Sequence, residues 1–175
     1  MTEARLAEGE GGWREPQGEG WYVLNARDAK WQENELGFYC NFEGDVPFPE
    51  FGFNISRLPA GAPMAMYHRE PHQEGFFVLD GEAVLIVEGE ERPLRRWDYV
   101  HVPRDVPHVI VATGEGAVVL AAGGRTGESG VFYPAEPVAA RHGAAAETDT
   151  DQPREAYARF SPLVDRRYTG DFLPD

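Results

Sequence analysis

The fold is decided by residues 76–88, whose sequence is FFVLDGEAVLIVE. Two runs rich in β-branched and aromatic side chains, 76–79 and 82–88, flank the dipeptide Asp80-Gly81. An Asp-Gly pair between two such runs is typical of the tight turn of a β-hairpin. This stretch therefore predicts two antiparallel strands that are joined at Asp80-Gly81.

The pattern continues on both sides of this hairpin. Residues 51–58 alternate large apolar side chains with small or polar ones, as in a strand with one buried face. Further short apolar runs, bounded by glycine and proline, predict strands at 91–94, 99–102, 108–112 and 117–121, with a turn over 113–116. Short strands at this regular spacing are typical of an antiparallel sandwich or barrel, so we expect an all-β fold.

The composition is that of one ordinary globular domain. The chain has 175 residues, of which 42% are hydrophobic, and a formal net charge of −14 at pH 7. Such a negative chain repels phosphate backbones and anionic lipids, so we expect neither nucleic acid nor a membrane as a partner. The single cysteine, Cys40, cannot form an internal disulfide, and the acidic N-terminus lacks the apolar segment of a secretory signal. These features predict a cytoplasmic protein.

We expect three parts along the chain. Residues 1–20 are rich in glycine and glutamate and predict a flexible lead-in without secondary structure. Residues 21–135 hold the predicted strands and form the barrel domain. Residues 136–175 form a C-terminal extension that packs on the barrel, and Pro153 is expected in the first turn of a short helix there. Because small barrels often cover unpaired strand edges with a partner, the sequence also predicts a homodimer.

Residues 67–74, YHREPHQE, concentrate the side chains that can bind a metal ion. A helical zinc site with His68 and His72 one turn apart is excluded by Pro71, which would cost about 3 kcal/mol inside a helix. In an extended strand, His68 and Glu70 point the same way, because side chains two residues apart share a face.

Two further candidate ligands come from other predicted strands. Glu74 enters the strand that follows the metal-binding window and faces inward ahead of its apolar run. His108 follows the turn PRDVP at 103–107, which directs the histidine back into the barrel. Long side chains carried by separate strands can converge on one ion in this way.

These residues resemble the two motifs of the cupin family, of the single-domain cupin-2 type. Gly61, His68, Glu70, Glu74 and Gly81 are similar to the first motif, G-x(5)-H-x-H-x(3,4)-E-x(6)-G, and Asp98, Pro103 and His108 to the second, G-x(5)-P-x-G-x(2)-H-x(3)-N. The resemblance implies a double-stranded β-helix, or jelly-roll, barrel, here with a short helical C-terminal extension. Many cupins hold one divalent metal ion with three histidines and one glutamate.

The sequence departs from the motifs in a way that bears on the metal. Glu70 stands where the family has its second histidine, while Trp97, Asp105 and Ala112 replace two glycines and the asparagine of the second motif. A second carboxylate would offset the charge of a divalent ion more fully, and this favours harder ions over Cu(I). The expected cofactor is therefore one divalent transition metal: Fe, Mn, Zn or Ni.

The resemblance implies a metal site formed by four side chains, those of His68, Glu70, Glu74 and His108. His72 or Gln73 can take the place of Glu70 as ligand, and the sequence does not decide between these alternatives.

The resemblance also implies two kinds of function. The first is a metal-dependent enzyme, a dioxygenase-like oxygenase, an isomerase or a decarboxylase that acts on a small organic acid or a phenol. The second is a non-catalytic cupin that binds or senses a small molecule and whose metal is structural or absent. The sequence contains no G-x-S-x-G motif, and Cys40 lies outside the cupin motifs, so a serine or cysteine nucleophile is not expected.

Overall fold

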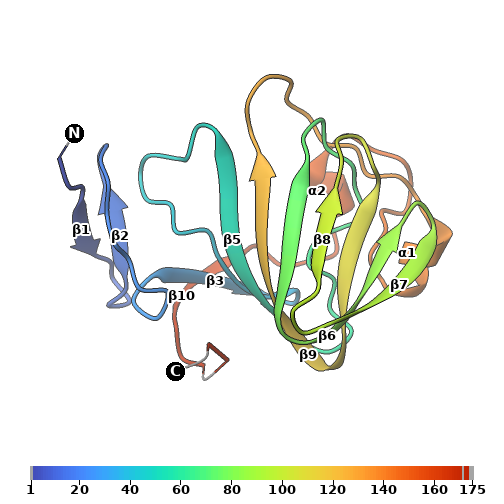
Figure 1. Cartoon of the computed structure of the whole chain (residues 1–175), viewed down its shortest axis with the longest axis horizontal. Coiled ribbons are helices and arrows are strands. Elements are labelled where there is room, and N and C mark those ends of the chain that lie inside the picture. Colours follow the sequence, from blue (N-terminus) through green and yellow to red (C-terminus); the bar gives the residue numbers. More distant parts are fainter. Residues whose placement is uncertain (1, 171, 174–175) are drawn as a thin grey trace.

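The computed structural model of the protein describes residues 2–170, 172 and 173. The strands are β1 (Arg5–Glu8), β2 (Arg14–Gln17), β3 (Lys30–Asn34), β4 (Gly37–Cys40), β5 (Phe51–Leu58), β6 (Glu74–Val87), β7 (Glu90–Arg95), β8 (Tyr99–Val102), β9 (His108–Gly124) and β10 (Val164–Arg167), and the helices are α1 (Pro137–Arg141) and α2 (Pro153–Ala156). Strands dominate these residues, so the all-β prediction is confirmed (Figure 1).

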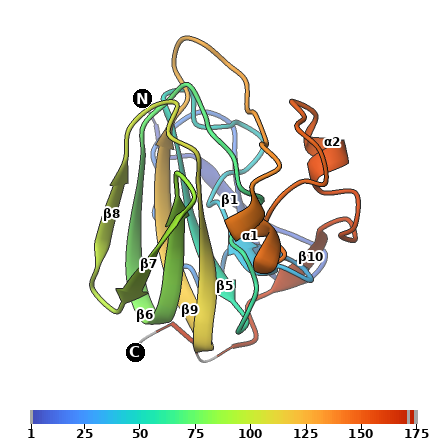
Figure 2. The same ribbon diagram turned by 90° about the vertical axis from the view of Figure 1, so that its right-hand side faces the viewer.

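One large antiparallel sheet forms the barrel. Its strands follow the order β10-β3-β4-β5-β9-β6-β7, and β8 pairs with the first part of β6. Residues 74–77 of β6 therefore lie between β8 and β9, whereas residues 82–87 lie between β7 and β9. Both helices lie on the side of the sheet away from β8 (Figure 2). The strands β5 and β8 have the bounds that the sequence predicts.

The predicted hairpin turn at Asp80-Gly81 is wrong. β6 runs through both residues as one strand, and its pairing with β9 is irregular between Val78 and Asp80 and again after Gly81. The φ angle of Gly81 is +76°, and a Cβ atom at this position would lie 2.0 Å from the carbonyl oxygen of Gly116. Glycine is therefore required by a close approach between strands at a bulge, and the chain does not reverse there.

The turn predicted over residues 113–116 is also part of a single strand. Within β9, Thr113 lies opposite Glu82 and Ala117 lies opposite Gly81, so three residues of β9 have no counterpart in β6. This insertion bends both strands. The parts of β6 and β9 before and after this insertion can therefore contribute to different parts of the barrel wall.

The strands bury a different set of side chains on each face. Ile110 of β9 packs inside the barrel with Phe76 and Leu85, while Val109 and Val111 point to the outer face. The outer cluster is covered by α1 and by the buried alanines that follow it. Burial of each side chain of this size contributes about 1.5–3 kcal/mol, so the alternation within β9 holds both layers together.

The expectation that residues 1–20 lack secondary structure is wrong. β1 and β2 pair as an antiparallel hairpin, which stands at the end of the molecule opposite the helices (Figure 1). The N–H group of Arg14 donates to the carbonyl of Asp28 (2.6 Å), and that of Gly18 donates to the carboxylate of Asp45 (2.8 Å). Hydrogen bonds from main-chain N–H groups to distant residues hold this segment in place. Its few apolar side chains form no pattern from which these strands could be predicted.

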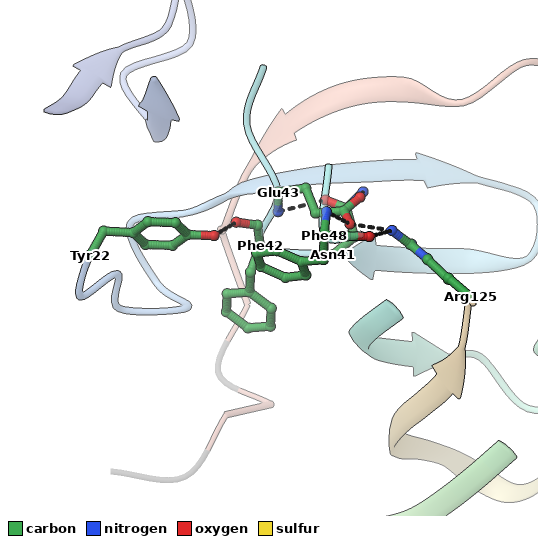
Figure 3. Close-up of polar contacts among 6 residues, drawn as sticks. All are labelled: Tyr22, Asn41, Phe42, Glu43, Phe48 and Arg125. Atoms are coloured by element: carbon green, nitrogen blue, oxygen red, sulfur yellow. Dashed lines mark hydrogen bonds and ion pairs between the residues drawn. The ribbon is translucent and has the colours of Figure 1, made fainter. Parts of the chain in front are cut away.

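The loop between β4 and β5 is tied to the end of β9 by an ionic contact (Figure 3). The Glu43 carboxylate accepts hydrogen bonds from the N–H of Phe48 (2.9 Å) and from the guanidinium of Arg125. Arg125 also donates to the carbonyl of Phe48 (3.2 Å). On the other side of the loop, the hydroxyl of Tyr22 donates to the carbonyl of Phe42 (3.0 Å). These bonds fix the strand end next to the candidate site described below.

The C-terminal extension lies against the barrel. β10 pairs with β3, and the ring of Phe172 contacts Trp31 edge-on with ring centroids 5.4 Å apart. α2 begins at Pro153, as expected, although it ends at Ala156 after a single turn. Among the described residues, no helix has the length and the hydropathy that a membrane span needs.

We predict that Cys40 reacts with thiol reagents only after unfolding. Its side chain is 1% exposed, and burial raises the pKa of its thiol to about 11. Because the thiolate is the reactive form, native protein at pH 8 should release less than about a tenth of an equivalent from a chromogenic disulfide such as DTNB within minutes. The same reagent in guanidinium chloride should report one thiol. Fast labelling of the native protein would contradict the burial.

Candidate metal centre

The two candidate histidines are paired through their main chains. His68 donates its N–H to the carbonyl of His108 (3.1 Å), and His108 donates its N–H to the carbonyl of His68 (2.9 Å). Residues that exchange both bonds across an antiparallel pair carry their side chains on the same face. The two imidazole rings accordingly lie side by side, with centroids 5.1 Å apart.

The segment that carries His68 is not the regular strand that the sequence predicts. Between β5 and β6, the chain forms only isolated bridges, from Pro63 to Val111, from His68 to His108 and from Arg69 to Phe132. The extended conformation is therefore confirmed at single residues and is wrong for the segment as a whole. Each bridge fixes one residue against β9 or against the C-terminal part of the chain.

The hydrogen bonds of both imidazoles assign their tautomers. Nδ1 of His68 lies 2.7 Å from the carbonyl of Met66, and Nδ1 of His108 lies 3.0 Å from the carbonyl of Val106. A carbonyl oxygen only accepts, so each Nδ1 carries the proton and each Nε2 presents a lone pair. Nε2 of His108 is buried and has no hydrogen-bond partner among the described residues. Metal-binding histidines are oriented in this way by a carbonyl behind the ring.

Glu74 completes a compact group with the two histidines. Its Oε2 lies 3.3 Å from Nε2 of His108 and 3.9 Å from Nε2 of His68. Two atoms that each lie about 2.1 Å from one ion are at most about 4.2 Å apart, so both distances suit a shared ion. Among the residues that the structure describes, the ligand atoms of His68, Glu74 and His108 all lie within 4.8 Å of one another.

Burial shifts the acid–base equilibria of all three groups. It raises the pKa of Glu74 to about 8, and the neighbouring charge of Glu70 adds to the shift. Burial lowers the pKa of His108 to about 4, with a contribution from His68, whose own pKa burial also lowers. Without a cation, the neutral forms of all three are thus favoured at pH 7. A divalent cation favours the carboxylate and needs neutral imidazoles, so the donor set fits such an ion.

Glu70 lies beside this group, at the more exposed end of the site. Its Oε1 is 3.7 Å from Nε2 of His68, and its side chain is 33% exposed. The carbonyl of Glu70 accepts the N–H of Asp105 (2.7 Å), which fixes its main chain near the turn before β9. Of the four candidate ligands, the structure therefore brings three into one group and leaves Glu70 next to it.

The alternative ligands to Glu70 point elsewhere. Nε2 of His72 lies 2.9 Å from the carbonyl of Thr126, in the loop after β9. Gln73 is exposed, and His101 of β8 is exposed on the opposite face of the sheet. The geometry therefore favours Glu70 over His72 and Gln73 as an additional group at the site.

The site includes two tyrosines that the sequence analysis missed. Tyr133 and Tyr157 line a cavity of about 270 Å³, the inner cavity, together with His68, Glu74 and His108. The hydroxyl of Tyr157 accepts the N–H of Met66 (3.1 Å), and burial raises the pKa of both phenols, which therefore stay protonated at neutral pH. Both follow the barrel strands in sequence, so motif spacing carries no information about them.

An antiparallel barrel that brings two imidazoles and a carboxylate together on its inner wall defines the class: a β-barrel protein with a group that can hold a metal ion. Residues 54–122 match the family model described as a cupin domain. This segment contains most of β5, all of β6 to β8 and most of β9, and it is similar to cupin domains of the cupin-2 type, in agreement with the motif resemblance.

One of the similar solved structures has the same fold over most of this chain. A sugar phosphate isomerase of the cupin superfamily from Silicibacter pomeroyi is 21% identical over 78% of this chain and 80% of its own, with a TM-score of 0.50. KdgF from Halomonas sp. is 22% identical over 55% of this chain and 88% of its own (TM-score 0.47). A putative sugar phosphate isomerase from Acidithiobacillus ferrooxidans is 27% identical over 47% of this chain, and the match spans about half, 55%, of that protein (TM-score 0.44). No curated protein matches the sequence.

Proposed function

We propose that the protein is a mononuclear metal-dependent cupin in which His68, Glu74 and His108 hold one divalent transition ion, Fe, Mn, Zn or Ni. The observation that carries this proposal is the buried, unpartnered Nε2 of His108, which faces the carboxylate of Glu74. Three protein ligands leave positions open for a ligand with oxygen donors, and we propose a small organic acid or a phenol as that ligand.

A bound ion would supply Lewis acidity, which polarises a carbonyl or lowers the pKa of a hydroxyl. The residues of this chain would do the remaining work. Glu70 is placed to take up or return a proton at the exposed end of the site. The phenols of Tyr133 and Tyr157 remain hydrogen-bond donors at neutral pH, and Phe76 helps to exclude water from the inner cavity. This arrangement suits an oxygenase, an isomerase or a decarboxylase.

A second candidate is a cupin that binds or senses a small molecule without turnover. The replacement of the family's second histidine by Glu70 favours this candidate. The group of ligand atoms within 4.8 Å of one another contains three residues, one fewer than the four ligands of the family motif. Metal-loaded protein should be incubated with organic acids and phenols while oxygen uptake and product formation are followed. Turnover that disappears with the metal supports the enzyme, whereas saturable binding without turnover supports the sensor.

The metal site itself predicts a large thermal stabilisation. The metal is first removed with a chelator, and Mn²⁺, Zn²⁺, Ni²⁺ or, without oxygen, Fe²⁺ is then added at about 100 times its dissociation constant. The free energy of unfolding should rise by about 2.7 kcal/mol. For a chain of this length, that corresponds to a rise in Tm of about 5–10 °C, readable by scanning fluorimetry.

A matched pair of variants tests whether the rise comes from this site. Glu74→Gln should abolish most of it, because the amide is neutral and a weak ligand. Glu82→Gln, an exposed position in the same strand, should retain it. Less than about a tenth of an equivalent of any metal after reconstitution, measured by elemental analysis, would overturn the proposed function.

The homodimer stays a prediction, and it has its own measurement. In sedimentation equilibrium at micromolar concentrations, we expect a mass of twice the 19.5 kDa of one chain. A mass of one chain over the whole concentration range would contradict the expectation that a second copy covers the strand edges.

A further inference from the structure

A second, larger space lies next to the inner cavity. This outer chamber has a volume of about 560 Å³ and is lined by β4, β5 and the C-terminal segment 154–163. Four residues line both spaces: Tyr39, Ser56, Met64 and Tyr157. The two spaces therefore share part of one wall. The outer chamber has a size that is typical of a site for a complete small molecule.

The wall of the outer chamber is largely apolar. Its large apolar lining residues are Leu36, Phe38, Leu58, Met64, Phe160, Pro162 and Leu163. Its polar side chains already have partners within the protein: Asn34 donates to the carbonyl of Ser161 (3.1 Å) and accepts the N–H of Leu36 (2.9 Å). The hydroxyl of Ser161 donates to Glu35 (2.6 Å). The chamber thus offers contact area and few free polar groups, which suits the apolar body of a ligand.

Arg154 is the exception in this lining. It is the one charged side chain among the described residues that line the outer chamber, and it makes no hydrogen bond or ion pair with any other described residue. Some exposed arginines of the chain are paired with a carboxylate, such as Arg166 with Glu33 and Arg104 with Glu128, and Arg154 is not among them. In a protein with a net charge of −14, an unpaired cation beside an apolar chamber is a local attraction for an anion.

We propose that the outer chamber binds the apolar body of an elongated molecule that has an oxygen donor group at the metal centre and an anionic group at Arg154. This inference rests on the proposed function, because the ion would bind the inner end of the molecule. The substrate class is then an organic acid whose two polar ends are separated by an acyl chain or a ring system. The chamber selects for length, and Arg154 selects for the charge at the far end.

The test measures the binding of two series of probes to the metal-loaded full chain by calorimetry. The dicarboxylates hexanedioate, octanedioate and decanedioate should bind progressively tighter, by about fourfold for each buried methylene group, until the chamber is filled. The monocarboxylates octanoate and decanoate should show the same dependence on length but bind less tightly than the dicarboxylate of equal length. Affinities that ignore length would overturn the proposal.

Two variants separate the two parts of the proposal. Arg154→Gln should weaken the dicarboxylates about fivefold and leave the monocarboxylates unchanged, since the interaction it removes is exposed. Arg92→Gln, which removes an exposed arginine on β7, is the matched control and should change neither series. Leu36→Trp, in the turn between β3 and β4, should fill the chamber and remove the dependence on length. Equal effects of Arg154→Gln and Arg92→Gln would overturn the role of Arg154.

The measurements also distinguish this proposal from the metal site on which it rests. Metal content and Tm report the metal centre alone. If no metal binds but the affinity for the carboxylate probes still depends on their length and on Arg154, the chamber is supported and the proposed function fails. If metal binds as expected and the affinity for the probes depends on neither their length nor Arg154, the chamber proposal is overturned and the metal site stands.

Discussion

His108→Gln is expected to weaken metal binding by at least about 100-fold, because loss of the partners behind a ligand alone costs 10- to 100-fold. His108 is 2% exposed, and its Nε2 makes no hydrogen bond with any described residue, so no protein group takes the place of the ion. The carbonyl of Val106 holds the ring in the binding tautomer, so the lone pair is available without rearrangement. Glutamine keeps most of the volume of the side chain and limits the cavity that alanine would leave.

Equilibrium dialysis with elemental analysis measures this effect, and circular dichroism verifies the fold. His101→Gln is the matched control, because His101 lies on β8 with its side chain exposed on the other face of the sheet. Its metal content should equal that of the unmodified protein. If His108→Gln and His101→Gln bind the ion equally well, the three-residue group is not the metal site.

The second large effect concerns stability. Trp31→Ala is expected to lower the free energy of unfolding by about 3–5 kcal/mol, since it removes a fully buried aromatic side chain and leaves a cavity. The indole contacts Tyr168 and Phe172 of the C-terminal extension and donates from Nε1 to the carbonyl of Ala26 (2.8 Å). The substitution therefore also loosens the extension from the barrel.

Urea unfolding followed by circular dichroism measures the change. Trp21→Ala is the control, because the side chain of Trp21 is 54% exposed, and its loss should cost less than about 0.5 kcal/mol. A loss below about 1 kcal/mol in Trp31→Ala would mean that the extension contributes little to the stability of the fold.

The sequence predicted those strands that depend on local alternation. The strand at 51–58 has the predicted bounds because large apolar residues alternate with small or polar ones along all of it. The sequence pattern divides each of β6 and β9 into two predicted strands, because Asp80-Gly81 and Gly114 have the same local signature in a bulge as in a hairpin turn. Only the pairing of two strands distant in sequence decides between the two.

The candidate site was predictable to the extent that spacing encodes it. His68, Glu74 and His108 occupy motif positions, and the structure brings them together. The tyrosines of the inner cavity could not be found in this way, because they reach it from the part of the chain that follows the barrel. The hairpin over β1 and β2 was missed for a related reason, since its bonds run to residues far along the chain.

The main-chain pairing of His68 with His108 separates the scaffold of the site from its chemistry. Their spacing is set by two peptide hydrogen bonds and does not depend on the side chains that the two residues carry. Donor atoms at positions 68 and 108 can therefore be exchanged while the backbone keeps its geometry, and the main chain at position 70 is held separately by the N–H of Asp105. Glu70→His would restore a third imidazole, and the preference of the barrel among transition ions would then become a property that can be engineered one side chain at a time.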